Sequence, residues 1–134
     1  MYKTPKILLI ALLISFITPT FAQNKSTQSK AVTVKEWKTP AKSGVRYLDQ
    51  MTKYNEKGQK IEQIEYSNYG QASRTTYEYD SKGNCVKQVI YDAKNKVVRI
   101  RKFEYYADGS KKRQLNYDPS GKLVSTRDFE YIFK

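Results

Sequence analysis

Apolar and polar residues alternate along most of the chain, in short stretches separated by turn residues. Successive side chains of a β-strand point to opposite faces, so this alternation predicts strands rather than amphipathic helices. We predict seven strands, at residues 45–54, 59–66, 71–79, 84–91, 96–106, 111–117 and 122–133. Residues 31–40, with Val32, Val34 and Trp37, could add a first edge strand, followed by a loop at 40–44.

A turn motif of the form Tyr-x-x-x-Gly separates these strands. Its tyrosines are Tyr54, Tyr66, Tyr79, Tyr91, Tyr105 and Tyr117. Its final positions, which step by 12, 13, 12, 14 and 12 residues, are Gly58, Gly70, Gly83, Asn95, Gly109 and Gly121. Glycine and asparagine tolerate the positive φ that tight turns require, so we interpret these six as structural turn residues. Turns at this spacing, without helical segments between them, predict an antiparallel meander.

The hairpins define an all-β fold, but the sheet could stay open, curl, or close on itself. Aliphatic residues are few, and tyrosine takes their place. A tyrosine buries a large ring while its hydroxyl stays near water. This composition favours an open or curled sheet, with a small closed β-barrel as the alternative. The alternation also predicts one aromatic-rich face, and it places Cys85 on the same face as Val89 and Tyr91.

The N-terminal segment has the pattern of a secretory signal peptide. Lys3 and Lys6 precede an apolar run at 7–17, and small residues before position 23 predict cleavage after Ala22. The polar residues that follow lack periodicity, which is typical of a disordered linker. The predicted organisation is a signal peptide (1–22), a linker (23–30) and a single β-repeat domain (31–134). We expect export to the periplasm or secretion, with no transmembrane segment after cleavage; a retained N-terminal anchor is the alternative.

Composition excludes several chemistries. The chain has 134 residues, no histidine and one cysteine, which rules out a histidine-dependent catalytic relay, a histidine metal site and an intramolecular disulfide. It carries 25 Lys+Arg against 13 Asp+Glu, a formal charge of +12. Loss of Lys3 and Lys6 with the signal peptide would reduce this to +10. We expect no catalytic residue, no cofactor and no bound metal.

Three groups of side chains could nevertheless carry chemistry. Cys85 could act as a nucleophile or pair with another chain, but a half-buried structural thiol is favoured, because there is no histidine to activate it. Glu78 and Asp80, two positions apart in a strand, could share a face, whereas Glu62 and Glu65 should not. The aspartates of the turn motif are better explained as turn-capping residues than as calcium ligands; they are Asp80, Asp92 and Asp118.

Two basic stretches lie on consecutive predicted strands. We predict six of their residues as contacts for an anion or a partner: Arg99, Arg101, Lys102, Lys111, Lys112 and Arg113. Cationic side chains interleaved with aromatic rings can bind polyanions by charge and stacking. An exposed β-surface also needs charge to stay soluble, so a solvated face is the alternative. For an exported protein we expect an anionic glycan or lipid of the cell envelope, or a protein, and no nucleic acid.

The segment Thr76–Asp92, TYEYDSKGNCVKQVIYD, resembles the YD (RHS-type) repeat, whose approximate pattern is Y-x-Y-D-x-x-G-N. Tyr117–Leu123, YDPSGKL, is a second match, so the resemblance covers residues 54–123. It implies a continuous β-sheet and a surface or secreted location, although the few units present cannot form a full shell. The chain is also similar in format to small tyrosine-rich exported proteins of Bacteroides-type bacteria, whose function is unknown. Neither resemblance supplies site residues.

We therefore expect a non-enzymatic exported β-repeat protein that acts as a binding module. Its ligand would be an anionic envelope component or a protein partner. The alternative is a small secreted inhibitor of an enzyme such as a protease, which would present a loop at 38–46 or 105–112.

Overall fold

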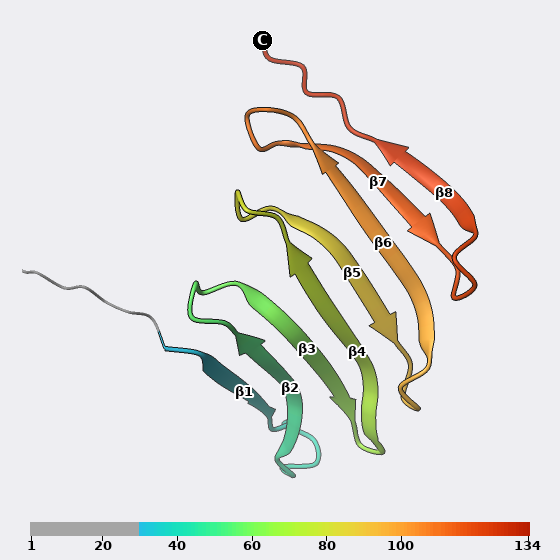
Figure 1. The fold of residues 1–134 in the computed structure, drawn as a ribbon. Coiled ribbons are helices and arrows are strands. Elements are labelled where there is room, and N and C mark those ends of the chain that lie inside the picture. Colours follow the sequence, from blue (N-terminus) through green and yellow to red (C-terminus); the bar gives the residue numbers. More distant parts are fainter. Residues whose placement is uncertain (1–29) are drawn as a thin grey trace, which may run out of the picture.

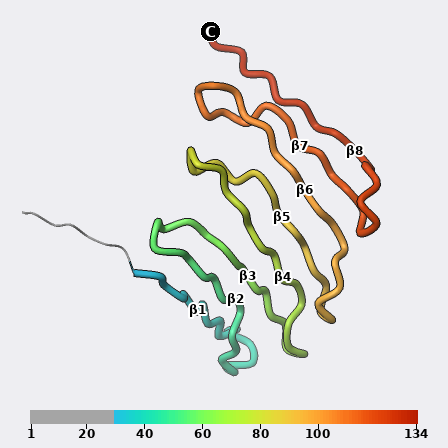
Figure 2. Tube along the Cα trace, viewed as in Figure 1, coloured from blue at the N-terminus to red at the C-terminus, as the bar shows by residue number. Residues whose placement is uncertain are grey.

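The computed structural model describes residues 30–134, which form one antiparallel sheet of eight strands (Figure 1). The strands are β1 (Val32–Lys38), β2 (Tyr47–Tyr54), β3 (Lys60–Ser67), β4 (Gly70–Tyr79), β5 (Cys85–Tyr91), β6 (Val97–Tyr105), β7 (Lys111–Tyr117) and β8 (Leu123–Asp128). Their spatial order equals their chain order, and each described strand contacts only those next to it. The all-β meander is confirmed, and the sheet is open, with β1 and β8 at opposite edges (Figure 2).

The predictions for the two ends of the chain differ from the structure or lie outside it. The predicted signal peptide and all of the predicted linker except Lys30 lie outside the described residues. In residues 30–134 there is no helix that could cross a membrane. β1 is a full strand, so the sheet has eight strands rather than seven. The last strand ends at Asp128 rather than at residue 133, because only the Phe129 N–H, 3.0 Å from the Lys112 carbonyl, continues the backbone ladder beyond it.

The turns are held by a repeated set of hydrogen bonds, which the turn after β4 illustrates. The Asp80 N–H donates to the Asn84 carbonyl at 3.0 Å, and the Gly83 N–H donates to the Asp80 carbonyl at 3.1 Å. The Asp80 carboxylate accepts from the N–H groups of Lys82 and Asn84, both at 2.9 Å. The same bonds recur in the turns that begin at Asn55, Asp92 and Asp118.

The six turn residues named from the sequence all have positive φ, between 60° at Asn95 and 105° at Gly70. Gly70 differs from the others in position. It opens β4 directly after a two-residue turn at 68–69, whereas the other five lie inside longer turns. The β3–β4 hairpin is therefore tighter than its neighbours.

Every pair of neighbouring strands contains a β-bulge, and six of the seven bulges lie at a turn-entry tyrosine. Between β4 and β5, Tyr79 pairs with Cys85 and Glu78 with Lys87, so Val86 is the extra residue. An extra residue moves the alternation to the other face of the sheet. The predicted position of Cys85 was therefore wrong: it shares a face with Tyr79, opposite to the face of Val89 and Tyr91.

The register divides the side chains between two faces, since directly paired residues lie on the same side. We call one the amide face; its paired residues include Gln63–Thr75–Ile90 and Gln88–Arg101–Asn116. We call the other the ion-pair face; it carries Lys53, Glu62, Arg74, Glu78, Lys87, Glu104 and Arg113.

The prediction of one aromatic face was wrong, because each bulge reverses the alternation. The turn-entry tyrosines at one end of the sheet lie on the amide face, and those at the other end lie on the ion-pair face. The first group is Tyr54, Tyr79 and Tyr105, and the second is Tyr66, Tyr91 and Tyr117.

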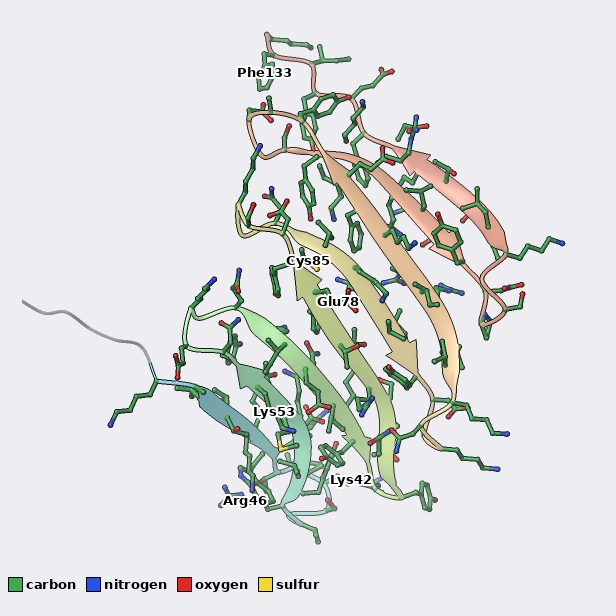
Figure 3. All side chains as sticks on the ribbon, in the orientation of Figure 1. Lys42, Arg46, Lys53, Glu78, Cys85 and Phe133 are labelled. Atoms are coloured by element: carbon green, nitrogen blue, oxygen red, sulfur yellow. The ribbon has the colours of Figure 1, made fainter. Side chains whose placement is uncertain are left out.

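Both faces of the sheet meet solvent, and side chains project from both sides (Figure 3). Of the described residues, only Thr52, Ile64 and Phe103 are buried, with 2%, 9% and 7% of their surface exposed. Cross-strand polar contacts supplement this limited burial. On the ion-pair face Glu62 forms ion pairs with both Lys53 and Arg74, and the Arg74 guanidinium lies 4.2 Å from the centre of the Tyr91 ring.

Tyrosine hydroxyls connect the strands in a regular series on the amide face. The hydroxyl of Tyr79 donates to the Lys60 carbonyl at 2.8 Å, and that of Tyr105 to the Cys85 carbonyl at 2.6 Å. The hydroxyl of Tyr131 donates to the Lys111 carbonyl at 2.9 Å. Each acceptor is the first residue of a strand, β3, β5 or β7. The structural repeat is therefore a pair of strands.

Candidate anion-binding groove

A shallow groove crosses β6, β7 and β8 on the amide face. Its volume is ≈ 460 Å³, within the roughly 300–1,000 Å³ of small-molecule sites. Its lining residues are Val98, Arg99, Arg101, Gln114, Asn116, Tyr117, Asp118, Val124, Ser125 and Arg127. Most of these are polar, and three are arginines, so the groove suits a charged ligand better than an apolar one.

The strand register explains why the arginines meet in this groove. Arg99 and Arg101 lie on the amide face of β6, while the residues between and after them lie on the ion-pair face. Arg127 occupies the position on β8 that Arg101 has on β6. Strands two apart in a sheet are separated by roughly 10 Å. On β7 between them, Asn116 pairs with Arg101, and Gln114 pairs with Arg127. The floor of the groove therefore consists of guanidinium and amide groups on adjacent strands.

The amides of β7 are oriented by their own hydrogen bonds. The Gln114 side-chain NH₂ donates to the Asn116 side-chain oxygen at 2.9 Å. The Asn116 NH₂ donates in turn to the Ser125 hydroxyl, also at 2.9 Å. This chain of bonds holds the centre of the groove in one arrangement, which reduces the conformational entropy that a bound ligand would cost.

The groove is electropositive. Within residues 30–134, none of its three arginines forms an ion pair. Asp118 is the one acidic lining residue. Its carboxylate accepts hydrogen bonds from the N–H groups of Ser120 and Lys122 at 2.9 and 3.0 Å. Hydrogen bonds from Ser120 and Lys122 lower the pKa of Asp118 and keep it charged. Three arginines and one aspartate leave the groove with a net charge of +2.

Arg101 contains a polar atom that needs a partner. Its Nε, like that of Arg74 on the ion-pair face, is buried and has no hydrogen-bond acceptor in the described part of the chain. A buried donor without an acceptor costs about 1–3 kcal/mol. Arg99 and Arg127 are exposed beside it. An anion in the groove could contact the exposed guanidinium groups and the half-buried side chain of Arg101 together.

The six predicted basic contacts do not form one patch. Arg99 and Arg101 lie in the groove, on the amide face. Lys111 is at the far end of that face, with its amine 4.4 Å from the centre of the Phe103 ring, and Lys112 lies 5.8 Å from that of Tyr106. The other two are on the ion-pair face: Lys102, 5.3 Å from the centre of the Tyr117 ring, and Arg113, paired with Asp128 at 2.6 Å and Glu104 at 3.9 Å.

Arg127 was missed as a site residue. The sequence does contain a signal for it, because Arg101 and Arg127 stand four residues before Tyr105 and Tyr131. Recognition of the two-strand repeat would have placed the two arginines at equivalent positions. The Tyr-x-x-x-Gly motif marks single turns and does not reveal that longer repeat.

The other candidate groups have structural partners. Burial raises the pKa of the Cys85 thiol, which keeps it protonated and disfavours a nucleophilic role. Glu78 pairs with Lys87 at 2.8 Å, and Asp80 caps its turn. Glu62 and Glu65 lie on opposite faces. No group of three or more potential metal ligands occurs among residues 30–134.

The fold places this chain among the all-β proteins built from a single open sheet. The chain belongs to a family described as "Uncharacterised protein", whose model matches residues 27–130. A search of curated proteins finds no match. Among solved structures, the chain is similar to one in a crystal structure of accessory secretory protein 1, 2 and 3 from Streptococcus pneumoniae, with 18% sequence identity and a TM-score of 0.36. That match covers 72% of this chain and only 17% of the streptococcal chain.

Proposed function

We propose that this chain is a non-enzymatic, exported β-repeat protein that binds an anionic component of the cell envelope in the groove of β6–β8. The observation that supports this most is the set of three arginines, Arg99, Arg101 and Arg127, that line one groove without ion-pair partners among the described residues. Export is inferred from the N-terminal sequence pattern.

The chemistry of the groove favours carboxylate or phosphate groups. A guanidinium offers a planar set of donors that matches either oxyanion, and such charge-assisted bonds are stronger than neutral ones. On the opposite face, Arg113 has both Asp128 and Glu104 as partners. This contrast distinguishes the groove from general surface charge. Arginines that serve only solubility can be paired with carboxylates, as Arg113 is, whereas the groove arginines have no such partner among the described residues.

The proposal can be tested by binding to two probes, an acidic polysaccharide and vesicles with anionic headgroups. Arg101→Gln and Arg127→Gln each remove one guanidinium from the groove. Hydrogen bonds to charged groups contribute about 1.5–3 kcal/mol each, so each variant should bind at least tenfold more weakly. The matched control is Lys94→Gln, which removes the same charge from the exposed turn between β5 and β6, outside the groove lining.

The salt dependence gives a second criterion. Anion binding by several guanidinium groups should weaken steeply as the salt concentration rises. The proposal is wrong if the groove variants and Lys94→Gln bind alike, or if binding does not change with salt. Preference for the polysaccharide or for the vesicles would identify the source of the anion.

Two other expectations remain predictions. An inhibitor would present the loop at 38–46 or at 105–112, and screening the protein against proteases would test this. The resemblance to YD repeats implies a surface or secreted location, which cell fractionation would test.

A further inference from the structure

The two edges of the sheet are complementary to each other. β8 is antiparallel to every odd-numbered strand, because the meander alternates direction. A copy of β1 placed beside β8 would therefore continue the antiparallel pattern with both faces unchanged. An open strand edge presents unpaired N–H and carbonyl groups that favour such an addition. Both edge strands are exposed along their whole length.

A recurrent ion pair indicates the register of this addition. In three hairpins, the residue just before the turn-entry tyrosine pairs directly across to an oppositely charged residue. These pairs are Lys53–Glu62, Glu78–Lys87 and Glu104–Arg113. The contact joins β2 to β3, β4 to β5, and β6 to β7. The corresponding contact on the outer side of β8 would be the fourth of the series.

Glu130 occupies the even-strand position of this fourth contact. It precedes Tyr131, whose hydroxyl bond to Lys111 repeats those of Tyr79 and Tyr105. The segment Phe129–Tyr131 also has the same sequence, FEY, as Phe103–Tyr105. Within residues 30–134, Glu130 has no ion-pair partner.

Lys35 occupies the odd-strand position. Each odd-strand residue of these ion pairs also pairs with a residue of the next strand along the chain, and that residue always stands three before a tyrosine of the hydroxyl series. These pairs are Glu62–Thr76, Lys87–Lys102 and Arg113–Asp128. Lys35 pairs in the same way with Met51, three before Tyr54. Like Glu130, it forms no ion pair with a described residue. A second copy of the chain would thus place Lys35 opposite Glu130, with opposite charge.

Exposed apolar side chains are concentrated at the same two edges. On β1, Val32 and Trp37 expose 49% and 50% of their surface. On β8 and just beyond it, Leu123, Val124 and Tyr131 expose 47%, 67% and 48%. At this register an added β1 would cover part of the Val32, Trp37 and Tyr131 side chains, whereas Leu123 and Val124 lie beyond its end.

We propose that copies of this chain associate head to tail, with β1 of one copy pairing antiparallel to the C-terminal end of β8 and the residues just beyond it in the next copy, and with Lys35 opposite Glu130. The two surfaces that meet are different, so the association does not close after two copies. It produces a continuous sheet that can extend.

Cysteine cross-linking tests both the partner and the register. The full chain would carry Cys85→Ser, Lys35→Cys and Glu130→Cys. Directly paired residues place their Cβ atoms about 4.5–5.5 Å apart, close to disulfide geometry. Mild oxidation should give a ladder of dimers, trimers and larger species on a non-reducing gel. The control replaces Lys35→Cys by Glu36→Cys, one residue along and on the opposite face, and should stay monomeric.

Two cross-linking results would overturn the proposal. One is a monomer with an internal disulfide, which would mean that the sheet closes on itself. The other is no cross-link, or equal ladders from both cysteine pairs, which would mean that no specific pairing occurs at this register.

Charge reversal gives a second measurement that does not depend on cysteine chemistry. Glu130→Lys and Lys35→Glu each place like charges opposite one another, and each should weaken association on the order of tenfold in sedimentation equilibrium. Mixing the two variants should restore association, because each mutated edge then meets its complement. Circular dichroism checks that both variants keep the wild-type sheet. Association that is insensitive to both reversals, or a chain that is monomeric at all concentrations, would contradict the proposal.

Discussion

The hydroxyl series on the amide face predicts a measurable loss of stability when one hydroxyl is removed. The Tyr105 hydroxyl donates to the Cys85 carbonyl at 2.6 Å, and Tyr105 is half-buried. Tyr105→Phe keeps the ring and removes this bond. An internal hydrogen bond contributes about 0.5–1.5 kcal/mol. For a domain of this size, about 1 kcal/mol corresponds to a decrease in Tm of roughly 4–8 °C.

The assay is thermal unfolding followed by circular dichroism, with Tyr69→Phe as the control. Tyr69 is 99% exposed, so loss of its hydroxyl should leave the Tm almost unchanged. If Tyr105→Phe and Tyr69→Phe unfold at the same temperature, the hydroxyl bond does not contribute to stability. Tyr79→Phe removes the equivalent bond to the Lys60 carbonyl and should lower the Tm by a similar amount.

Three further predictions concern the turns and the thiol. Hydrogen bonds from turn amides lower the pKa of Asp80 and Asp92, so the contribution of these carboxylates to stability is complete above about pH 4 and is lost as the pH falls through the lowered pKa. The stability advantage of the wild-type chain over Asp80→Asn, measured by urea unfolding, should therefore disappear in acid. Asn95→Ala should cost about 1–2 kcal/mol, because alanine is disfavoured at a φ of 60°, whereas the same measurement on Lys94→Ala should show little change. Cys85 should react with iodoacetamide more slowly in the folded protein than in urea, because burial raises its pKa; equal rates would contradict this.

The sequence was sufficient to predict the hairpins, because their chemistry is local. A glycine or asparagine with positive φ, and an aspartate whose carboxylate caps the turn, are properties of four or five consecutive residues. Asp80 and Gly83 specify their turn in this way wherever the hairpin lies. An antiparallel meander follows once the turns are known, since each strand pairs with the next along the chain.

The faces of the sheet could not be predicted in the same way. The bulges depend on which backbone groups pair across two strands. Six of the seven coincide with a turn-entry tyrosine, but a tyrosine at that position is equally compatible with an uninterrupted alternation. Val86 is the extra residue beside Tyr79, and nothing in the segment Cys85–Tyr91 indicates that its alternation is interrupted. One extra residue in a strand moves the side chains beyond it to the opposite face, so Cys85 was predicted on the wrong face. The arginine groove was predicted incompletely for a different reason: its third arginine, Arg127, lies on β8, beyond the two strands first considered.

A one-layer sheet joined only between neighbours has a consequence for how the protein folds. Contacts link residues that are close in the chain, which favours rapid folding and allows it to begin at any hairpin. Opening should begin at the two outer strands, so amide exchange should be slowest in β4 and β5 and faster toward β1 and β8. In such an architecture a pair of strands is a modular unit, and its duplication or loss would change the length of the sheet without disturbing the packing of the remaining units.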